Sequence, residues 1–408
     1  MEEIKIPVKL GNIVFKNPFY VASGPTTKTV KQLMRIEETG WAAASIKLTI
    51  DPYPYINHKP RYAFFENYNA LGFTADKRLS LDEGLTLVRD AKKVLNDLLL
   101  FANISYAGEN INDTAGWVNM ARQFEDAGID VIELNMCCPN MSFNVELSSG
   151  KKESLKVKSG ASLSGDPELI AKIVGEIKKT VSIPVFVKLS PEGGQIAESA
   201  KIIYAAGADA VGGTGNRMGI PPINLEDPSK SLLELQEEIS VNCYSGPWLK
   251  PLALRDTYEI RRNSSPENFI MATGGITSWQ DAVEMILCGA NLTGICTATL
   301  LNGYDIVRPM IKEIKSYMER KGFRDLGDFR GFLAKEIKTA REITIHDGYA
   351  ELIKQGCADK CGLCKKICSS FAPEHTDPNN IVINRELCTG CGVCSYRCPG
   401  KNIRMIRK

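Results

Sequence analysis

The 408-residue sequence lacks the features that would place it in a membrane or on nucleic acid. No apolar run approaches the roughly 20 residues that a membrane-spanning helix needs. The first residues, Met1 to Lys5, lack the apolar segment of a signal peptide. The formal net charge is only +2, which gives no reason to expect a nucleic-acid partner. We therefore expect a cytoplasmic protein that binds neither membrane nor nucleic acid.

Cysteine, by contrast, is abundant. Thirteen cysteines in such a compartment indicate metal binding or catalysis rather than disulfides, and eight of them follow residue 356. The last four have gaps of two, two and three residues and a following proline, which is the spacing of bacterial ferredoxins: Cys388, Cys391, Cys394 and Cys398. In that arrangement three thiolates hold one cluster and the fourth reaches a second cluster.

A second run of four cysteines precedes it, with one extra residue in the first gap and no trailing proline: Cys357, Cys361, Cys364 and Cys368. Two such runs in tandem predict two [4Fe–4S] clusters in a small ferredoxin-like domain, and zinc is the alternative for the same thiols.

Short β-branched runs alternate with longer amphipathic segments before the cysteine block, a pattern typical of an α/β fold with a parallel sheet wrapped by helices. Eight runs are expected to be strands: 19–24, 42–47, 98–105, 131–136, 185–190, 210–214, 269–273 and 292–296. Eight strand–helix units fit a (β/α)8 TIM barrel of about 250 residues with insertions, and a doubly wound open sheet is the alternative. We expect the barrel at 1–325, a helical connector at 326–355 and the ferredoxin-like domain at 356–408.

Polar residues and glycines follow the ends of the predicted strands, where TIM barrels carry their active sites. Glycines after strand seven, Gly274 and Gly275, precede a helix, and Cys296 and Thr297 follow strand eight. Such loops favour a phosphate group, although a tight turn alone would also need the glycines. Lys47 and Lys188 end apolar strands, so an anion such as a reduced flavin is expected between them, unless both are solvated at the rim.

The fourth strand runs directly into two thiols and two carboxamides, in the stretch from Asn135 to Asn140. A thiol beside amides can donate a proton next to hydrogen-bonding groups, whereas an inert buried cysteine is the alternative. Spacing alone does not decide between Cys137 and Cys138. The long polar stretch 141–166 follows at once, and we expect it to form a lid over the substrate.

Several of these motifs match one known family. They are Asn-x-x-Cys-Pro-Asn after strand four, Ala-Ser-Gly after strand one, the lysine of strand two, 69–73, 245–247 with 251–255, and Ala-Thr-Gly-Gly-Ile at 272–276. The chain resembles the dihydroorotate dehydrogenase superfamily. Within it, the FMN and iron–sulfur portion of dihydropyrimidine dehydrogenase is the most similar, over nearly the whole chain.

The resemblance implies an FMN- and iron–sulfur-dependent oxidoreductase that reduces or oxidises a ring C=C bond, with the 5,6-bond of a pyrimidine base favoured. Cys138 would exchange the proton at C5 while FMN exchanges hydride with C6. The substrate would contact Asn69, Asn135, Cys137, Asn140 and Asn216. FMN would contact Ala22, Ser23, Gly24, Lys47, Asn103, Lys188, Thr214, Gly246, Gly274, Gly275, Cys296 and Thr297.

Three departures from the family pattern lie around the substrate. Cys137 stands where the family has Ser, Ala107 where the pyrimidine reductases have Asn, and Gly215-Asn216 where they have Asn-Thr. Unmet hydrogen bonds cost about 1–3 kcal/mol per group, so these changes bear on the ligand more than on the reaction. Oxidation of dihydroorotate and reduction of a non-pyrimidine ring are the alternatives. A tRNA-modifying flavin barrel would need a basic surface, and intact Cys138, Asn135 and Lys47 oppose a pure electron-relay role.

No Gly-x-Gly-x-x-Gly motif follows a strand in a dinucleotide-binding unit, so the chain has no predicted nicotinamide site. Electrons should therefore pass to or from a partner, either an NAD(P)H-oxidising flavoprotein subunit or a ferredoxin, in a homo- or hetero-oligomer. The acid-free basic residues from Arg397 to Lys408 are candidates for docking it, with a solvated tail as the alternative.

Overall fold

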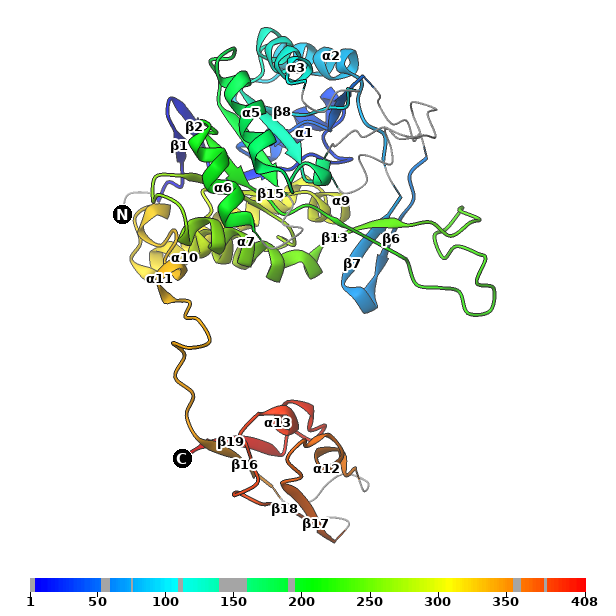
Figure 1. Cartoon of the computed structure of the whole chain (residues 1–408), viewed down its shortest axis with the longest axis vertical. Helices are drawn as coiled ribbons and strands as arrows, with labels where there is room; N and C mark the ends of the chain where they lie inside the picture. Colours follow the sequence, from blue (N-terminus) through cyan, green and yellow to red (C-terminus); the bar gives the residue numbers. More distant parts are fainter. Residues whose placement is uncertain are drawn as a thin grey trace. The chain divides into compact units, whose positions relative to one another are not determined.

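The computed structural model describes residues 4–52, 59–74, 76–108, 113–138, 160–189, 195–354, 361–377 and 380–408. The chain forms two compact units, Met1–Ile337 and Lys338–Lys408 (Figure 1). In the part of the chain that the structure describes, no helix combines the length and apolar character needed to cross a membrane.

The first unit is a closed barrel of eight parallel strand positions, and each of the eight predicted runs contributes a strand. They are β3 (Phe19–Val21), β4 (Ala43–Ser45), β8 (Leu99–Tyr106), β9 (Val131–Met136), β10 (Val185–Leu189), β11 (Ala210–Gly212), β14 (Phe269–Thr273) and β15 (Leu292–Ile295). β15 pairs with β3 and closes the ring. β5 (Thr49–Asp51) extends the second strand position, and Lys47 lies in the break between β4 and β5. The predicted TIM barrel is confirmed.

Helices alternate with these strands and pack around the ring. They are α1 (Val30–Thr39), α2 (Leu81–Lys92), α3 (Ala115–Asp126), α5 (Pro167–Lys178), α6 (Ile196–Ala205), α7 (Lys250–Arg262), α8 (Trp279–Cys288), α9 (Thr297–Asn302) and α10 (Val307–Lys321). Their starts follow local rules. At α2, the Ser80 side chain accepts from the N–H of Glu83, and the Glu83 carboxylate accepts from the N–H of Ser80. Such a cap stabilises a helix by about 1 kcal/mol.

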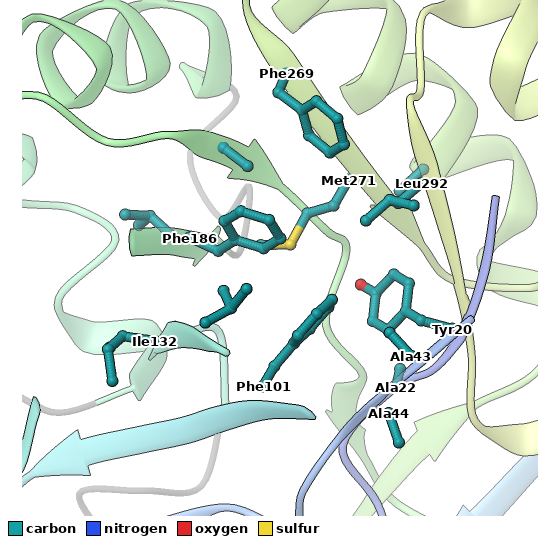
Figure 2. Close-up of a cluster of buried hydrophobic side chains, with 14 of the residues drawn as sticks. Tyr20, Ala22, Ala43, Ala44, Phe101, Ile132, Phe186, Phe269, Met271 and Leu292 are labelled. Carbon is teal, nitrogen blue, oxygen red and sulfur yellow. The ribbon is translucent and has the colours of Figure 1, made fainter. Parts of the chain in front are cut away.

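Aromatic side chains fill the N-terminal half of the barrel interior (Figure 2). The ring centroids of Phe101 and Phe186 lie 5.3 Å apart, and those of Phe186 and Phe269 lie 6.0 Å apart. Phe15 closes this layer from the hairpin of β1 (Val8–Leu10) and β2 (Ile13–Phe15), 6.0 Å from Phe101. Because strand side chains alternate between faces, Asn103 and Lys188 point the same way two residues after Phe101 and Phe186. The interior therefore changes from apolar to polar toward the C-terminal end.

A four-stranded antiparallel sheet adds to the barrel, in the order β12 (Arg217–Gly219), β13 (Asn242–Ser245), β7 (Ala70–Phe73) and β6 (Tyr62–Phe65). Short helical turns η1 (Glu66–Tyr68) and η3 (Pro247–Leu249) flank it. Its strands belong to the loops that follow barrel strands two and six, so they lie on the C-terminal side, where TIM barrels carry their sites. The sequence did not predict this sheet.

The segment predicted as a helical connector, 326–355, contains little helix. It forms η5 (Leu326–Asp328) and α11 (Leu333–Glu336), and then β16 (Gly348–Leu352) of the second unit. Residues 335–347 between them are exposed and include no helix beyond Glu336. Because these residues are exposed, no buried apolar face stabilises a helix there.

Over its described residues, the second unit contains two small two-stranded antiparallel sheets and two short helices. β16 pairs with β19 (Ile403–Arg407), and β17 (Pro373–Asp377) pairs with β18 (Asn380–Ile383). Helices α12 (Leu363–Ile367) and α13 (Val393–Arg397) each carry a cysteine into its core. That core contains Ala350, Cys364, Ile381, Cys394 and Ile403. A core this small usually needs a disulfide or a metal to hold a fold together.

Candidate active site

A single pocket collects most of the predicted site residues at the C-terminal ends of the barrel strands. It contains about 1100 Å³ of space not filled by atoms, its open mouth included. The predicted residues that line it are Ala22, Ser23, Gly24, Lys47, Asn135, Cys137, Cys138, Lys188, Thr214, Asn216, Gly246, Gly274, Gly275, Cys296 and Thr297. The four-stranded sheet adds apolar walls through Tyr62, Leu71 and Phe73.

Two predicted residues within the described ranges do not line this pocket. Asn103 is fully buried below it, inside the barrel. Asn69 is exposed at the end of η1, where its backbone carbonyl accepts from the N–H of Trp248 at 3.2 Å. Asn140 lies outside the described residues, as does most of the predicted lid, 141–159. The described end of that stretch returns to the site, because the N–H of Ala161 donates to the carbonyl of Cys138 at 3.0 Å.

One end of the pocket is made of glycines and small hydroxyls. Gly246, Gly274 and Gly275 have φ angles of +104°, +114° and +72°, which side chains rarely adopt. A Cβ on Gly275 would lie 2.5 Å from the backbone nitrogen of Lys250. Ser245 and Thr297 bring their hydroxyls within 2.8 Å of each other. Open backbone and paired hydroxyls fit a phosphate, so this end suits the phosphate arm of FMN.

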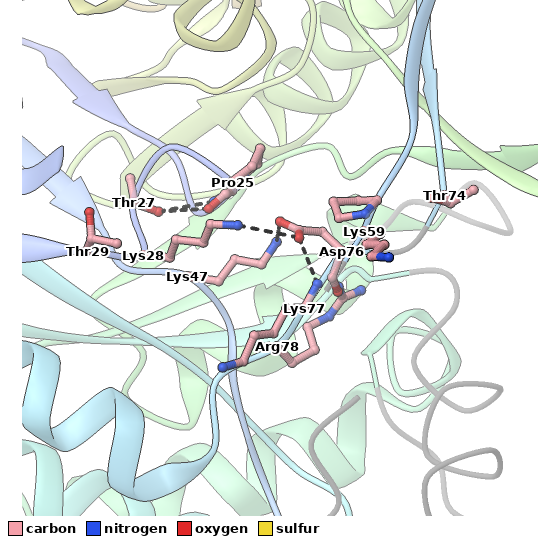
Figure 3. A network of polar contacts seen from close by, with 12 residues as sticks. Pro25, Thr27, Lys28, Thr29, Lys47, Lys59, Thr74, Asp76, Lys77 and Arg78 are labelled. Carbon is pink, nitrogen blue, oxygen red and sulfur yellow. Dashed lines mark hydrogen bonds and ion pairs between the residues drawn. The ribbon is translucent and has the colours of Figure 1, made fainter. Parts of the chain in front are cut away.

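Buried charges line the other end (Figure 3). The Lys47 ammonium lies 3.0 Å from one carboxylate oxygen of Asp76, and the Lys28 ammonium lies 3.7 Å from the other. Burial, followed by the charge of Arg78, lowers the pKa of Lys47, while Asp76 opposes the shift. Lys47 therefore has a counter-ion in the protein, in contrast to the expectation that a bound anion would neutralise both lysines.

Lys188 is different. It is 8% exposed, and within the described ranges no carboxylate forms an ion pair with it. Burial alone would lower its pKa, but the nearby Cys137 and Glu133 outweigh burial, and the pKa of Lys188 is raised. A buried cation of this kind is costly without an anion. It therefore fits the negative charge that a reduced flavin ring carries.

The two thiols have different surroundings. Cys137 is 4% exposed, and burial raises the pKa of its thiol to about 12, against the effect of Lys188. Cys138 is half-buried and faces the pocket. A guanidinium N–H of Arg78 donates to the Cys138 sulfur at 3.3 Å. Cys138 is thus the more accessible thiol and the one whose sulfur accepts a hydrogen bond from a guanidinium.

A buried hydrogen-bond chain holds the backbone of both thiols. The side-chain oxygen of Asn135 accepts from the N–H of Cys137 at 3.3 Å and from that of Cys138 at 3.0 Å. The Asn135 amide in turn donates to Asn103 at 2.9 Å, and Asn103 donates to the carboxyl group of Glu133. Asn135, predicted to hold the substrate, therefore uses most of its hydrogen-bonding capacity on the protein.

Three functional residues were missed by the sequence reasoning: Asp76, Arg78 and Glu133. The run Asp76-Lys77-Arg78 reads as a solvated charged turn before helix α2, yet the structure buries its first and third members. The sequence could have indicated Glu133, because a carboxyl group inside the apolar strand β9 needs hydrogen-bond partners. It receives them from Ser45 and Asn103.

The described cysteines of the second unit that lie near one another come from both sequence runs. One cavity is lined by Cys361, Cys364, Cys394 and Cys398. Cys394 also lies near Cys388, Cys391 and Cys368, whose charges add to burial in raising its pKa. Cys357 lies outside the described residues. Within the described ranges, no three Cys, His, Asp or Glu side chains converge on a point as around a single ion.

Comparison with known proteins assigns both units. Residues 5–318 match the profile of the family described as dihydroorotate dehydrogenase. The chain belongs to this family. Residues 381–404 match the 4Fe-4S binding domain. The chain is therefore an oxidoreductase of a flavin-dependent family, with a ferredoxin-like 4Fe–4S domain at its C-terminal end, and the predicted superfamily is confirmed.

Two groups of relatives share this barrel. The NAD-dependent dihydropyrimidine dehydrogenase subunit PreA of Escherichia coli (strain K12) is 28% identical over 95% of this chain and 83% of that protein. The dihydroorotate dehydrogenase B (NAD(+)) catalytic subunit of Thermoplasma volcanium is 29% identical over 81% of this chain and 99% of that protein. A crystal structure of DHODH from Eimeria tenella with ferulenol has a TM-score of 0.62, at 18% identity and over 80% of this chain and 88% of that one. That likeness shows the shared fold.

Proposed function

We propose that this protein is the FMN- and iron–sulfur-containing component of a dihydropyrimidine dehydrogenase and reduces the 5,6-double bond of a pyrimidine base. The observation that carries the proposal is the pocket itself, where the half-buried Cys138 sulfur shares one cavity with Lys188 and the glycine loops. An acid thiol beside a flavin site suits the addition of H⁻ and H⁺ across an activated C=C bond.

The residues present fit FMN. Gly246, Gly274 and Gly275 with Thr297 would hold its phosphate arm, and Lys188 would face its ring. Bound FMN supplies hydride transfer. The chain supplies the rest of the reaction. Cys138 gives a proton to the ring carbon next to the one that accepts hydride, while Asn135 fixes the backbone of that thiol.

The length of the relatives favours pyrimidine reduction over dihydroorotate oxidation. An alignment over 95% of this chain has to include most of the cysteine-bearing unit, as with the Escherichia coli subunit. The alignment with the Thermoplasma volcanium protein covers 99% of that protein but only 81% of this chain. Dihydroorotate oxidation is nevertheless the second candidate, because that protein is 29% identical over 81% of this chain.

Steady-state assays with uracil, thymine, dihydroorotate and non-pyrimidine cyclic enones test the substrate. We expect uracil or thymine to be reduced with the highest kcat/KM. If dihydroorotate is the best substrate, the second candidate function, dihydroorotate oxidation, replaces the first. A preference for the enones would show that the substitutions at Cys137, Ala107 and Asn216 have changed the substrate specificity of the site.

We further propose that the second unit holds two [4Fe–4S] clusters. Cys357, Cys361, Cys364 and Cys398 would bind one, and Cys368, Cys388, Cys391 and Cys394 the other. Cys361, Cys364 and Cys398 line one cavity, which supports a cluster that takes ligands from both runs. Cys394 lines the same cavity, and the ferredoxin spacing assigns it to the other cluster, in keeping with its proximity to Cys368, Cys388 and Cys391. Iron and acid-labile sulfide analysis of anaerobically purified protein should give about eight iron atoms per chain. Zinc in place of iron would contradict it.

Electrons would reach these clusters from a partner that oxidises NAD(P)H or from a ferredoxin, in a cytoplasmic hetero-oligomer. The Escherichia coli relative, named as a subunit of an NAD-dependent enzyme, supports such a partner. The isolated chain should turn over with a reduced low-potential dye but hardly with NADH or NADPH. Fast turnover of the isolated chain with NADH would contradict the partner.

A further inference from the structure

Arg78 places a buried guanidinium directly against the thiol of Cys138. Arg78 is 6% exposed, and one of its N–H groups lies 3.3 Å from the Cys138 sulfur. Another of its N–H groups donates to the backbone carbonyl of Asp76, which fixes the plane of the guanidinium. The side chain can be seen beside Asp76 in Figure 3.

The backbone around Arg78 is held firmly. The N–H of Leu79 donates to the carbonyl of Leu48 at 2.9 Å, and the carbonyl of Leu79 accepts from Ile50 at 3.0 Å. Ser80 then caps helix α2. Arg78 is thus attached to the barrel on its C-terminal side, so its contact with the sulfur does not depend on a free loop end.

We propose that Arg78 is the counter-ion of the Cys138 thiolate, the form of the sulfur produced each time this thiol donates its proton. The inference rests on the proposed role of Cys138 as the acid. A charge-assisted N–H···S⁻ bond is stronger than the same bond to a neutral thiol, so the guanidinium stabilises the thiolate more than the thiol. Cations beside a cysteine are a recognised cause of thiolate stabilisation.

The Cys138 thiolate exists between two proton transfers, one to the substrate and one from solvent. The S–H bond of Cys138 breaks, a C–H bond forms at the ring carbon, and the electron pair of the S–H bond stays on sulfur. Bound FMN would supply hydride to the neighbouring carbon, so the substrate would gain two electrons and two hydrogens in total. The sulfur carries a negative charge against Arg78 until a proton from solvent restores the thiol.

The electrostatics of Arg78 agree with this assignment. Burial by itself would lower the pKa of the guanidinium, but the charge and hydrogen bond of Cys138, together with the charges of Cys243 and Asp76, outweigh burial, and the pKa is raised. The other titratable groups that influence Cys138 or are influenced by it are Cys137, Cys243 and Lys188. Burial raises the pKa values of Cys137 and Cys243 to about 12, so both stay uncharged near neutral pH. Lys188 remains the second cation near the sulfur in every variant below.

The test measures the pH dependence of Cys138 alkylation by iodoacetamide in substrate-free holoprotein, followed on the Cys138 peptide by mass spectrometry. Only the thiolate reacts, so the pH midpoint of the rate reports its stability without any turnover. In Arg78→Gln we expect the midpoint to rise by about one pH unit, a tenfold loss of thiolate below the midpoint. Lys77→Gln is the matched control, since Lys77 is the next cation along the chain and pairs with Glu83. Its midpoint should equal that of the unchanged protein.

Arg78→Met keeps the apolar stem of the side chain and serves if the Gln variant loses its fold or its flavin, as judged by flavin absorbance. An unchanged midpoint in a folded Gln or Met variant would overturn the proposal. An equal rise in the Lys77→Gln control would overturn it too, because the effect would then be one of general charge. A shifted midpoint in a protein that reduces no pyrimidine would keep Arg78 as the counter-ion and reject only the substrate.

Discussion

The glycine end and the thiol end of the pocket are built from different parts of the chain. The glycine end uses backbone in left-handed conformations, and its nearby cation, Lys250, is neutralised at 2.7 Å by Asp281 and at 2.9 Å by Glu284. The thiol end uses buried side-chain charges. A phosphate keeps its charge throughout a reaction, so fixed backbone dipoles suffice for it. A thiol gains and loses charge at each turnover, and charged side chains can respond to that.

The comparison also indicates which end can change during divergence. A glycine in a left-handed turn has few substitutes, because any side chain is strained there. A charged side chain can be exchanged by a single substitution without altering the backbone. Two of the three departures from the family pattern, at Cys137 and Gly215-Asn216, line the pocket with Cys138.

The largest effect is expected at the thiol. Cys138→Ala should slow turnover on the order of 10²–10⁴-fold, because the proton then comes from water rather than from a positioned acid. Flavin content and thermal stability should stay unchanged. Cys137→Ala is the matched control and should cost much less activity. A larger loss in Cys137→Ala than in Cys138→Ala would exchange the roles of the two thiols.

The ion pair of Lys47 and Asp76 tests whether the thiol end depends on buried charge for its stability. Asp76→Asn should lower the free energy of unfolding of the barrel by about 3 kcal/mol at pH 7, because it removes the closest counter-ion of a buried lysine. Urea titrations followed by tryptophan fluorescence can measure this, since all four tryptophans lie in the barrel.

The same pair predicts a pH dependence. Burial would raise the pKa of Asp76, but Lys47 outweighs it, and the folded-state pKa is below the ordinary value of 3.8. The carboxylate therefore adds stability that is fully present above that value and is lost as the pH falls through the lower folded-state pKa. The difference between Asp76→Asn and the unchanged protein should shrink only below about pH 4. A difference that fades already between pH 7 and pH 5 would contradict the assignment.

The glycine end of the pocket should lose FMN affinity when its backbone geometry is disturbed. In Gly275→Ala, the new Cβ meets the Lys250 backbone nitrogen at 2.5 Å and the φ angle of +72° is strained. At about 1–3 kcal/mol for such strain, FMN affinity should fall roughly 5- to 150-fold. Gly303→Ala is the matched control, because its φ angle is +77° but nothing lies within 4 Å of the added atom. Equal losses of FMN in both variants would show that strain and not the pocket is responsible.

Lys188 provides the smallest and most specific test. Lys188→Met keeps the stem but removes the ammonium, and reduced FMN should bind about tenfold more weakly, while oxidised FMN changes less. Flavin fluorescence and anaerobic titration can measure the two affinities. Lys179→Met, at an exposed position, should leave both unchanged. Equal weakening of both redox forms would assign Lys188 to general flavin binding.

The sequence alone determined the strands and the position of most pocket residues. These features depend on local patterns, namely runs of β-branched residues and the order of strands around a barrel. Parallel strands bring all their carboxyl ends to one end of the barrel, so Lys188, Cys138 and Gly275 could be placed together without coordinates. The spacing of the eight cysteines after residue 356 is likewise a local pattern that can be recognised from the sequence alone.

Only the tertiary structure decided which charges meet. Lys47 could have faced a bound anion, but the loop after β7 brings Asp76 to it and Arg78 to the thiol. Asn69 belongs to a family motif, yet the turn at η1 leaves it exposed. Electrostatic pairing and burial depend on distances between segments far apart in the sequence, and residue type does not encode those distances.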